Sequence, residues 1–283
     1  MRSFSDYFTA HREELDALIF DIDGTLVKGA VPIPEAVDFI SRLQKEQFPY
    51  FFLTNDSGNS CRQKAEILCK CGINATASQI ISSGDAIAEY IRKNNFAGKK
   101  FYQCGEFGEP SFVESAGLRI TRNPHESDDC EGAVVGEGVY NWQREINGLL
   151  NFLLRHPGVP VLVGNPDSYW KSSRGVGIGA GTVMRMVASL IKEIGGDVQV
   201  TYIGKPYAPI YEYAEKHFAE MLPGCRKIEM SRIAMIGDSL VSDVRGAKNA
   251  GMLSFLVLTG VTSREHIAAA PPECRPDEAF DTL

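Results

Sequence analysis

Short apolar runs that end in polar or glycine-containing turns recur along this chain of 283 residues. Four of them stand out: residues 18–20, 50–53, 200–203 and 233–236. Each has the length and apolar content of a buried strand, and a segment with helix-like spacing of apolar residues follows each one, as in Glu35 to Gln47. Strands that alternate with helices predict an α/β fold built on a parallel sheet.

Polar side chains follow these strands at the point where each strand ends. They are Asp21 and Asp23 after the first strand, where the turn residue Gly24 follows them, Thr54 and Asn55 after the second, Lys205 after the third and Asp238 after the fourth. Because ligands bind at the carboxyl ends of parallel strands, we expect all four segments to meet in one crevice of one sheet. Neighbouring carboxylates repel each other unless a cation compensates, and this density of carboxylates suits Mg²⁺.

Composition narrows the range of partners. With 29 Lys and Arg against 36 Asp and Glu, the net charge is −7, so we expect no nucleic acid and no anionic membrane as partner. No apolar run reaches about 18 residues and the N-terminus has no signal-like stretch, which predicts a cytoplasmic location. The seven cysteines lack C-x-x-C spacing, so reduced thiols are favoured over zinc ligation by Cys69 and Cys71.

Residues 80–197 form a long α/β insert between the second and third strands. Its clearest helix, from Trp142 to Leu154, places apolar residues on one face. The glycine-rich run from Gly175 to Gly181 looks like a dinucleotide fingerprint, but Thr182 stands where the third glycine belongs. We therefore expect this run to be a loop at the edge of a substrate pocket.

The ordered motifs also resemble those of a known family. Asp21-x-Asp23-Gly24-Thr25-Leu26, Leu53-Thr54-Asn55, Gly204-Lys205-Pro206 and Gly237-Asp238-x-x-x-x-Asp243 are similar to the four motifs of the haloacid dehalogenase superfamily of phosphohydrolases. The match spans almost the whole chain. The insert, with Gly164-Asn165-Pro166-Asp167 near its end, resembles the type IIA α/β cap of the NagD-like branch.

The resemblance implies a Rossmann-like catalytic core of residues 1–79 and 198–283, with residues 80–197 as an inserted cap domain. It also implies a Mg²⁺-dependent phosphatase that hydrolyses small phosphomonoesters through an aspartyl-phosphate. Asp21 would be the nucleophile and Asp23 the general acid and base. Asp21, the backbone carbonyl of Asp23 and the carboxylate of Asp238 would hold Mg²⁺.

Further residues receive roles from the same resemblance. Gly24, Thr54, Asn55 and Lys205 would contact the phosphate, and Lys205 would also neutralise charge in the transition state. Asp243 would support Lys205 or the waters bound to the metal. Many relatives carry asparagine where this chain has Asp56, whose carboxylate would weaken phosphate binding unless it points away or caps the next helix.

The insert would supply contacts to the leaving group. The candidates are Glu137, Tyr140, Asn165, Asp167, Tyr169 and Trp170, of which we expect Asn165 and Asp167 to bind substrate. For Tyr140 and Trp170, ordinary packing is the favoured role.

Several alternatives stay open at this point. A phosphoryl-transferring mutase and a non-catalytic binding module on the same fold remain, while a phosphoacceptor receiver domain would leave the insert and Lys205 unexplained. The substrate is left open among nucleoside monophosphates, sugar or polyol phosphates, phosphoglycolate and pyridoxal phosphate. Caps of this branch often contribute to dimers, so a homodimer through the cap is a further expectation.

Overall fold

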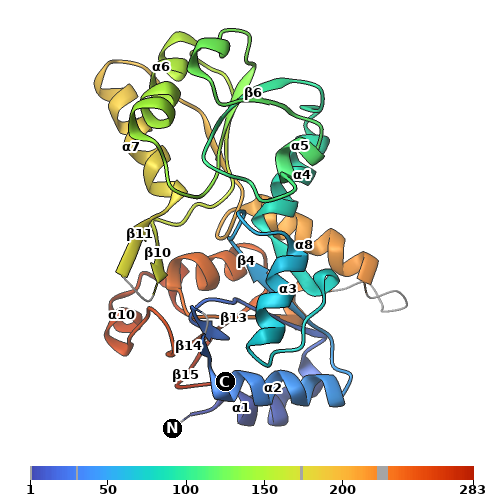
Figure 1. Ribbon diagram of the computed structural model, residues 1–283. Helices are drawn as coiled ribbons and strands as arrows, with labels where there is room; N and C mark the ends of the chain where they lie inside the picture. The colour runs from blue at the N-terminus through green and yellow to red at the C-terminus, as the bar shows by residue number, and fades with distance from the viewer. Residues whose placement is uncertain (1, 30, 173–174, 222–228) are drawn as a thin grey trace. The chain divides into compact units, whose positions relative to one another are not determined.

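The computed structural model describes residues 2–29, 31–172, 175–221 and 229–283. The chain divides into two compact units, which are described separately. The first unit comprises Met1–Thr54, Cys61–Ile81 and Ala214–Leu283, and the second comprises Asn55–Ser60 and Ser82–Tyr213. Each unit is built on its own sheet (Figure 1).

The first unit contains a six-stranded sheet in the order β15-β14-β13-β1-β4-β5. Its strands are β1 (Ala17–Phe20), β4 (Tyr50–Thr54), β5 (Ile80–Ser82), β13 (Ile233–Gly237), β14 (Leu253–Val257) and β15 (Glu278–Phe280). Strand β1 pairs in parallel with both β13 and β4, and all residues of these three strands are buried. Parallel strands covered on both faces read as continuous apolar runs, which is why the sequence predicted them.

Helices and short turns cover this sheet. They are α1 (Phe4–His11), η1 (Arg12–Glu14), α2 (Pro34–Lys45), α3 (Cys61–Lys70), η2 (Ala77–Gln79), α8 (Ala208–Met221), η5 (Met230–Arg232), η6 (Leu240–Val244), α9 (Arg245–Asn249), α10 (Arg264–Ala269) and η7 (Pro272–Cys274), with a small hairpin of β2 (Val27–Lys28) and β3 (Val31–Pro32). Helix α2 starts with Pro34 at its first turn and buries Ala36, Phe39, Ile40 and Leu43, so the helix predicted from Glu35 is confirmed. Helix α8 begins in the second unit and ends in the first.

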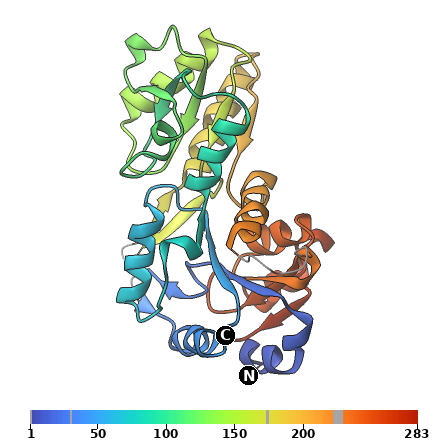
Figure 2. The same cartoon turned by 90° about the vertical axis from the view of Figure 1, so that its right-hand side faces the viewer.

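The two ends of the described chain lie side by side in the first unit (Figure 1, Figure 2). The N–H of Phe4 donates to the carbonyl of Thr282 at 3.0 Å, and Ser3 forms a bridge with the same residue. The ring of Phe4 is fully buried, with its centroid 5.3 Å from that of Phe39 and 5.4 Å from that of Phe280. Helix α1 is therefore anchored to the core through its aromatic face.

The second unit contains a five-stranded sheet in the order β12-β9-β8-β6-β7, with every pairing parallel. Its strands are β6 (Lys100–Cys104), β7 (Arg119–Thr121), β8 (Gly132–Val135), β9 (Val161–Val163) and β12 (Val200–Tyr202), and a separate hairpin consists of β10 (Tyr169–Ser172) and β11 (Gly175–Ile178). Its helices are α4 (Ser83–Lys93), α5 (Phe112–Ser115), η3 (Pro124–Glu126), η4 (Trp142–Ile146), α6 (Asn147–Arg155) and α7 (Ala180–Glu193).

The helices of this unit lie on both faces of its sheet, with α6 and α7 on one side and α4 and α5 on the other (Figure 1). Leu149 and Phe152 of α6 and Val187 of α7 pack on alternate strand residues such as Tyr102 and Val135. The helix predicted from Trp142 to Leu154 is confirmed, with its first turn formed as the π-helix η4. The predicted α/β class, with parallel sheets flanked by helices, is also confirmed.

Two expectations from the sequence are corrected. The strand before Lys205, β12, pairs with β9 in the five-stranded sheet, so Lys205 does not follow a strand of the sheet that carries Asp21 and Asp238. The run Gly175 to Gly181 is not a loop, because Gly175–Ile178 pairs with Tyr169–Ser172 as a hairpin and Ala180 begins α7. Residues 198–213 thus pack with the insert rather than with the core to which the sequence assigned them.

Two further observations bear on the class of protein. Within the described ranges, no helix has the length and apolar content needed to cross a membrane. Six cysteines form no disulfide bond within the described residues, and Cys225 lies outside them.

Truncation of Phe4 tests the anchoring of α1. We expect Phe4→Ala to lower the free energy of unfolding by about 3–5 kcal/mol, because it leaves a cavity among aromatic rings. Asp6→Ala, on the exposed side of the same helix, should cost well under about 1 kcal/mol. Urea denaturation followed by far-UV circular dichroism measures both, and equal effects of the two variants would contradict the proposed anchoring.

Candidate active site

Three carboxylates meet at the carboxyl end of the six-stranded sheet. Asp21 directly follows β1, Asp238 directly follows the neighbouring strand β13, and Asp243 lies in η6. One oxygen atom of each lies within 4.8 Å of one oxygen of the others. Asp238 and Asp243 are buried and Asp21 is half-buried. The prediction that strand ends bring Asp21 and Asp238 together is confirmed.

Backbone N–H groups hold two of these carboxylates in place, and a hydroxyl holds the backbone of Asp238. Oδ2 of Asp243 accepts hydrogen bonds from the N–H groups of Asp238, at 3.1 Å, and Ser239, at 3.0 Å. Oδ2 of Asp238 accepts from the N–H of Val261 at 2.7 Å, and its carbonyl accepts from the hydroxyl of Thr262 at 2.6 Å. Charge-assisted bonds of this kind fix the orientation of a carboxylate.

The donor set fits a hard divalent cation. Negative groups this close to one another, two of them buried, repel strongly unless a positive charge lies among them. Carboxylate oxygens are the ligands that Mg²⁺ prefers, and two or three of them are sufficient when water and substrate complete its coordination. Asp21 and Asp238 are therefore the residues that could hold such an ion, with Asp243 bracing the loop of Asp238.

Gly24 has a more specific role than the sequence suggested. Its φ is +88°, and a Cβ at this position would overlap the carboxylate of Asp238. The space that a side chain would take at this position is filled by Asp238, while the predicted contact of Gly24 with a phosphate stays a prediction. The hydroxyl of Thr259 donates to the carbonyl of Gly24 at 2.6 Å, which ties the two loops together.

The loop after β14, residues 259–262, was missed by sequence reasoning as part of the site. Thr259, Val261 and Thr262 supply the contacts described above, and a Cβ on Gly260 would overlap the carboxylate of Asp238. A signal existed, because Thr259 and Gly260 also come directly after an apolar strand. The Val261 N–H leaves no characteristic residue, and threonine hydroxyls are common in turns, so the position after the strand was the main indication.

Thr54 and Asn55 fall in different units. Thr54 is the buried last residue of β4, beside β1, whereas Asn55 belongs to the second unit. Nδ2 of Asn55 donates to Oδ1 of Asp167 at 3.1 Å and to the carbonyl of Lys205 at 3.0 Å. Oδ1 of Asn55 accepts from the N–H of Lys205 at 2.6 Å. Both donors of this side-chain amide thus have protein partners, and they hold the turn that carries Lys205.

Asp56 closes a turn within the same segment. Its Oδ1 accepts from the N–H groups of Gly58, at 2.7 Å, and Asn59, at 3.1 Å, and its Oδ2 accepts from Nδ2 of Asn59 at 3.0 Å. Asp56 therefore has a structural role, but in the turn before α3 rather than as the cap of that helix.

Two insert candidates, Glu137 and Asn165, contact each other near this segment. Oε1 of Glu137 accepts from the N–H of Ser57 at 2.7 Å, from its hydroxyl at 3.2 Å and from Nδ2 of Asn165 at 3.1 Å. Burial, together with the nearby charge of Asp56, raises the pKa of Glu137 from 4.5 to about 7. Oδ1 of Asn165 accepts from the N–H of Asp167 at 2.8 Å.

The aromatic candidates of the insert differ from one another. The hydroxyl of Tyr140 donates to the carbonyl of Gly136, and burial raises the pKa of Tyr140, so this residue has an internal role. Tyr169 is 47% exposed and Trp170 is 53% exposed, both on the β10–β11 hairpin. Contacts of any of these residues with a leaving group stay a prediction.

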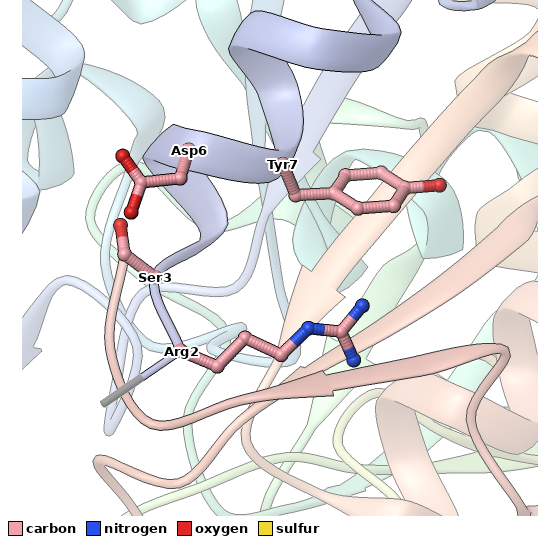
Figure 3. Close-up of a pocket in the computed structure, with 4 residues that line it drawn as sticks. All are labelled: Arg2, Ser3, Asp6 and Tyr7. Atoms are coloured by element: carbon pink, nitrogen blue, oxygen red, sulfur yellow. The ribbon is translucent and has the colours of Figure 1, made fainter.

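A surface hollow elsewhere in the first unit is lined by Arg2, Ser3, Asp6 and Tyr7 (Figure 3). The guanidinium of Arg2 bonds to Glu278 at 2.6 Å and lies over the ring of Phe280. These groups join the two ends of the chain, and the lining contains none of the carboxylates at the ends of β1 and β13.

Known proteins similar to this chain are found both among family models and among curated sequences. Residues 18–119 match the family model of haloacid dehalogenase-like hydrolases, and residues 202–283 match a HAD-hydrolase-like model. A curated relative, 5'-nucleotidase YutF of Bacillus subtilis, is 29% identical over 266 residues, which cover 94% of each chain.

Solved structures agree with these matches. A p-nitrophenyl phosphatase from Archaeoglobus fulgidus is 28% identical with a TM-score of 0.78, and the match covers 95% of this chain and 96% of the other. A glycerol phosphate phosphatase from Mycobacterium tuberculosis in complex with magnesium is 26% identical with a TM-score of 0.76, covering 99% and 77%. The fold and the relatives thus define the class of protein: a hydrolase with parallel sheets flanked by helices and an acidic site at the strand ends. The chain belongs to the haloacid dehalogenase-like hydrolases, in the NagD-like branch predicted from its sequence, and the prediction that it is an enzyme is confirmed.

Substitution of Gly24 tests the packing around Asp238. We expect Gly24→Ala to weaken binding of a divalent cation at this site by roughly 10–100-fold, because the new Cβ displaces the Asp238 carboxylate. Gly29→Ala is the matched control, since Gly29 also has a positive φ, +63°, but a Cβ there would meet nothing within 4 Å. Isothermal titration with Mg²⁺ compares the two variants. Equal affinities of the two variants would show that the close packing of Gly24 against the Asp238 carboxylate does not affect cation binding.

Proposed function

We propose that this chain is a Mg²⁺-dependent phosphatase that hydrolyses small phosphomonoesters through an aspartyl-phosphate on Asp21. The observation that carries the proposal is the grouping of Asp21, Asp238 and Asp243 at the ends of neighbouring strands. Relatives along almost the whole chain are a 5'-nucleotidase and two phosphatases, and their names support hydrolysis of phosphate esters.

Asp21, Asp238 and the backbone carbonyl of Asp23 would hold the cation. When bound, Mg²⁺ would supply the positive charge that offsets repulsion between the attacking carboxylate and the phosphate. The N–H of Val261 would keep Asp238 oriented for this task. Asp243 would keep the loop around Asp238 in place.

The remaining steps belong to the chain's own residues. A carboxylate oxygen of Asp21 attacks phosphorus, and the bond to the leaving oxygen breaks while Asp23 donates a proton to that oxygen. Asp23 then takes a proton from water, which attacks phosphorus and releases Asp21 and inorganic phosphate. We propose that Thr54 and the backbone of Asn55 contact the phosphate and that Lys205 offsets its charge. The side chain of Asn55 would serve to hold the turn of Lys205.

The substrate class follows from the relatives only in outline. They include a 5'-nucleotidase, a p-nitrophenyl phosphatase and a glycerol phosphate phosphatase. We infer that nucleoside monophosphates and sugar or polyol phosphates are the first substrates to test. The separate function of residues 80–197 as a cap, a homodimer through that cap and a cytoplasmic location all stay predictions.

Replacement of Asp21 tests the mechanism. With Mg²⁺, the purified chain should hydrolyse p-nitrophenyl phosphate, and Asp21→Asn should lower kcat at least about a thousandfold because it removes the nucleophile. Asp16→Asn is the matched control, since Asp16 is an exposed carboxylate that precedes the same strand and pairs with Arg232. Chelator-resistant turnover, or full activity of Asp21→Asn, would sink the mechanism.

A substrate panel separates this proposal from its alternatives. The panel measures phosphate release from nucleoside monophosphates, glycerol phosphate, sugar phosphates, phosphoglycolate and pyridoxal phosphate. At least one of these esters should be hydrolysed with a kcat/KM well above that for p-nitrophenyl phosphate. The Asp21→Asn variant provides the blank. A mutase would instead return a phosphorylated isomer without free phosphate, and a binding module would bind an ester without turnover.

A further inference from the structure

The segment Asn55–Ser60 follows strand β4 of the first unit but packs as part of the second. Three side chains of the second unit hold it. Oε1 of Glu137 accepts hydrogen bonds from the N–H and the hydroxyl of Ser57. Oδ1 of Asp167 accepts from Nδ2 of Asn55, and the hydroxyl of Ser83 donates to the carbonyl of Asn55 at 2.6 Å. Since this segment directly follows Thr54, its placement sets the backbone of Asn55.

We propose that Glu137 is a positioning residue for Asn55–Ser60, and that its carboxyl group holds this segment more weakly when it is ionised. The proposal rests on the proposed function in so far as the backbone of Asn55 contributes to phosphate binding. It assigns to Glu137 a task that is distinct from contact with a leaving group.

The geometry explains why ionisation matters. Oε1 of Glu137 already accepts from Ser57 and Asn165, and a Cβ on Gly58 would lie 3.4 Å from Oδ1 of Asp56 and 3.7 Å from Oε2 of Glu137. The second oxygen of Glu137 thus lies on the side of another carboxylate. A proton on Oε2 removes the repulsion between the two groups and leaves Oε1 able to accept its hydrogen bonds.

The direction follows from linkage. With the segment in place, the pKa of Glu137 is raised from 4.5 to about 7, first by burial and then by Asp56. Release of the segment hydrates Glu137 and returns its pKa to the ordinary value. The held arrangement therefore binds the proton more tightly, so it is most stable below pH 4.5 and loses stability as the pH rises to about 7.

The titratable neighbours of Glu137 among the described residues agree with this reading. Asp56, on the segment itself, raises the pKa of Glu137, whereas hydrogen bonds from Ser57 and Asn165 lower it. Tyr140, on the loop after β8, does not shift the pKa of Glu137; burial first, and then charges that include Glu137, raise the pKa of Tyr140, so its hydroxyl stays neutral in this range. Asp56 is thus the charge that can be removed to test the coupling.

Hydrogen exchange gives a readout that needs no turnover. In the wild-type chain, the protection of the Ser57 amide, corrected for its intrinsic exchange rate, should fall at least about tenfold between pH 5.5 and 8, as expected for a pKa difference of one unit or more. Glu137→Gln mimics the protonated carboxyl group, so its protection should stay constant over this range. A wild-type protection factor that does not change with pH would overturn the proposal.

Two variants with opposite effects keep the test independent of Glu137→Gln. Asp56→Asn removes a negative charge and should move the midpoint of the change to lower pH. Asn165→Ala removes a donor to the carboxylate and should move the midpoint to higher pH. A merely structural role of Glu137 would not produce shifts in opposite directions, and shifts in the same direction would overturn the coupling.

Kinetic measurements connect the ionisation of Glu137 to the reaction. The ratio of kcat/KM for Glu137→Gln to that of the wild-type chain should rise with pH through about 7, and ionisation of the substrate cancels in this ratio. Glu145→Gln is the matched control, because Glu145 is a buried carboxylate that also accepts from a backbone N–H, that of Asn141, outside the segment. A flat ratio for Glu137→Gln would overturn its positioning role. If no phosphate ester is turned over at all, the proposed function fails, and hydrogen exchange still decides the role of Glu137.

Discussion

Repulsion among Asp21, Asp238 and Asp243 is the constraint around which the first unit is built. Placing these carboxylates together is unfavourable unless each is oriented by donors and a cation lies between them. Backbone N–H groups supply the donors: those of Asp238 and Ser239 bond to Asp243, and that of Val261 bonds to Asp238. The hydroxyl of Thr259 ties the loop of Gly24 to the loop of Val261. Positions 24 and 260 require glycine, because a Cβ at either one would overlap the carboxylate of Asp238.

This constraint explains which parts of the site could be predicted from the sequence. Strands β1 and β13 are buried throughout, so their apolar runs were plain, and the residues after them had to lie at one edge of the sheet. The pairing of β1 with β13, which the structure adds, then places Asp21 beside Asp238. The loop after β14 contributes one backbone N–H, that of Val261, and two threonine hydroxyls that bond to backbone carbonyls. Donors of this kind are common in any turn, and this is why the loop's role was not visible.

The sheet to which β12 belongs could not be predicted for a different reason. Val200–Tyr202 is three residues long, and nothing local in it distinguishes pairing with β9 from pairing with a strand of the larger sheet. Such a choice is decided by tertiary packing. The raised pKa of Glu137 was equally out of reach, since it depends on burial and on Asp56, which is 81 positions earlier in the chain. Long-range electrostatics of this kind require coordinates.

The membership of Asn55–Ser60 in the second unit has a consequence for how such chains can exchange parts. An exchange of residues 80–197 alone between two relatives would leave Asn55 and Ser57 facing foreign partners in place of Asp167 and Glu137. It would also separate β9 from β12, its neighbour in the sheet. The module that can be inherited or grafted intact therefore consists of two pieces, residues 55–60 and residues 82–213. Recombination that keeps both pieces together would preserve the contacts, whereas a single cut at each end of the insert would not.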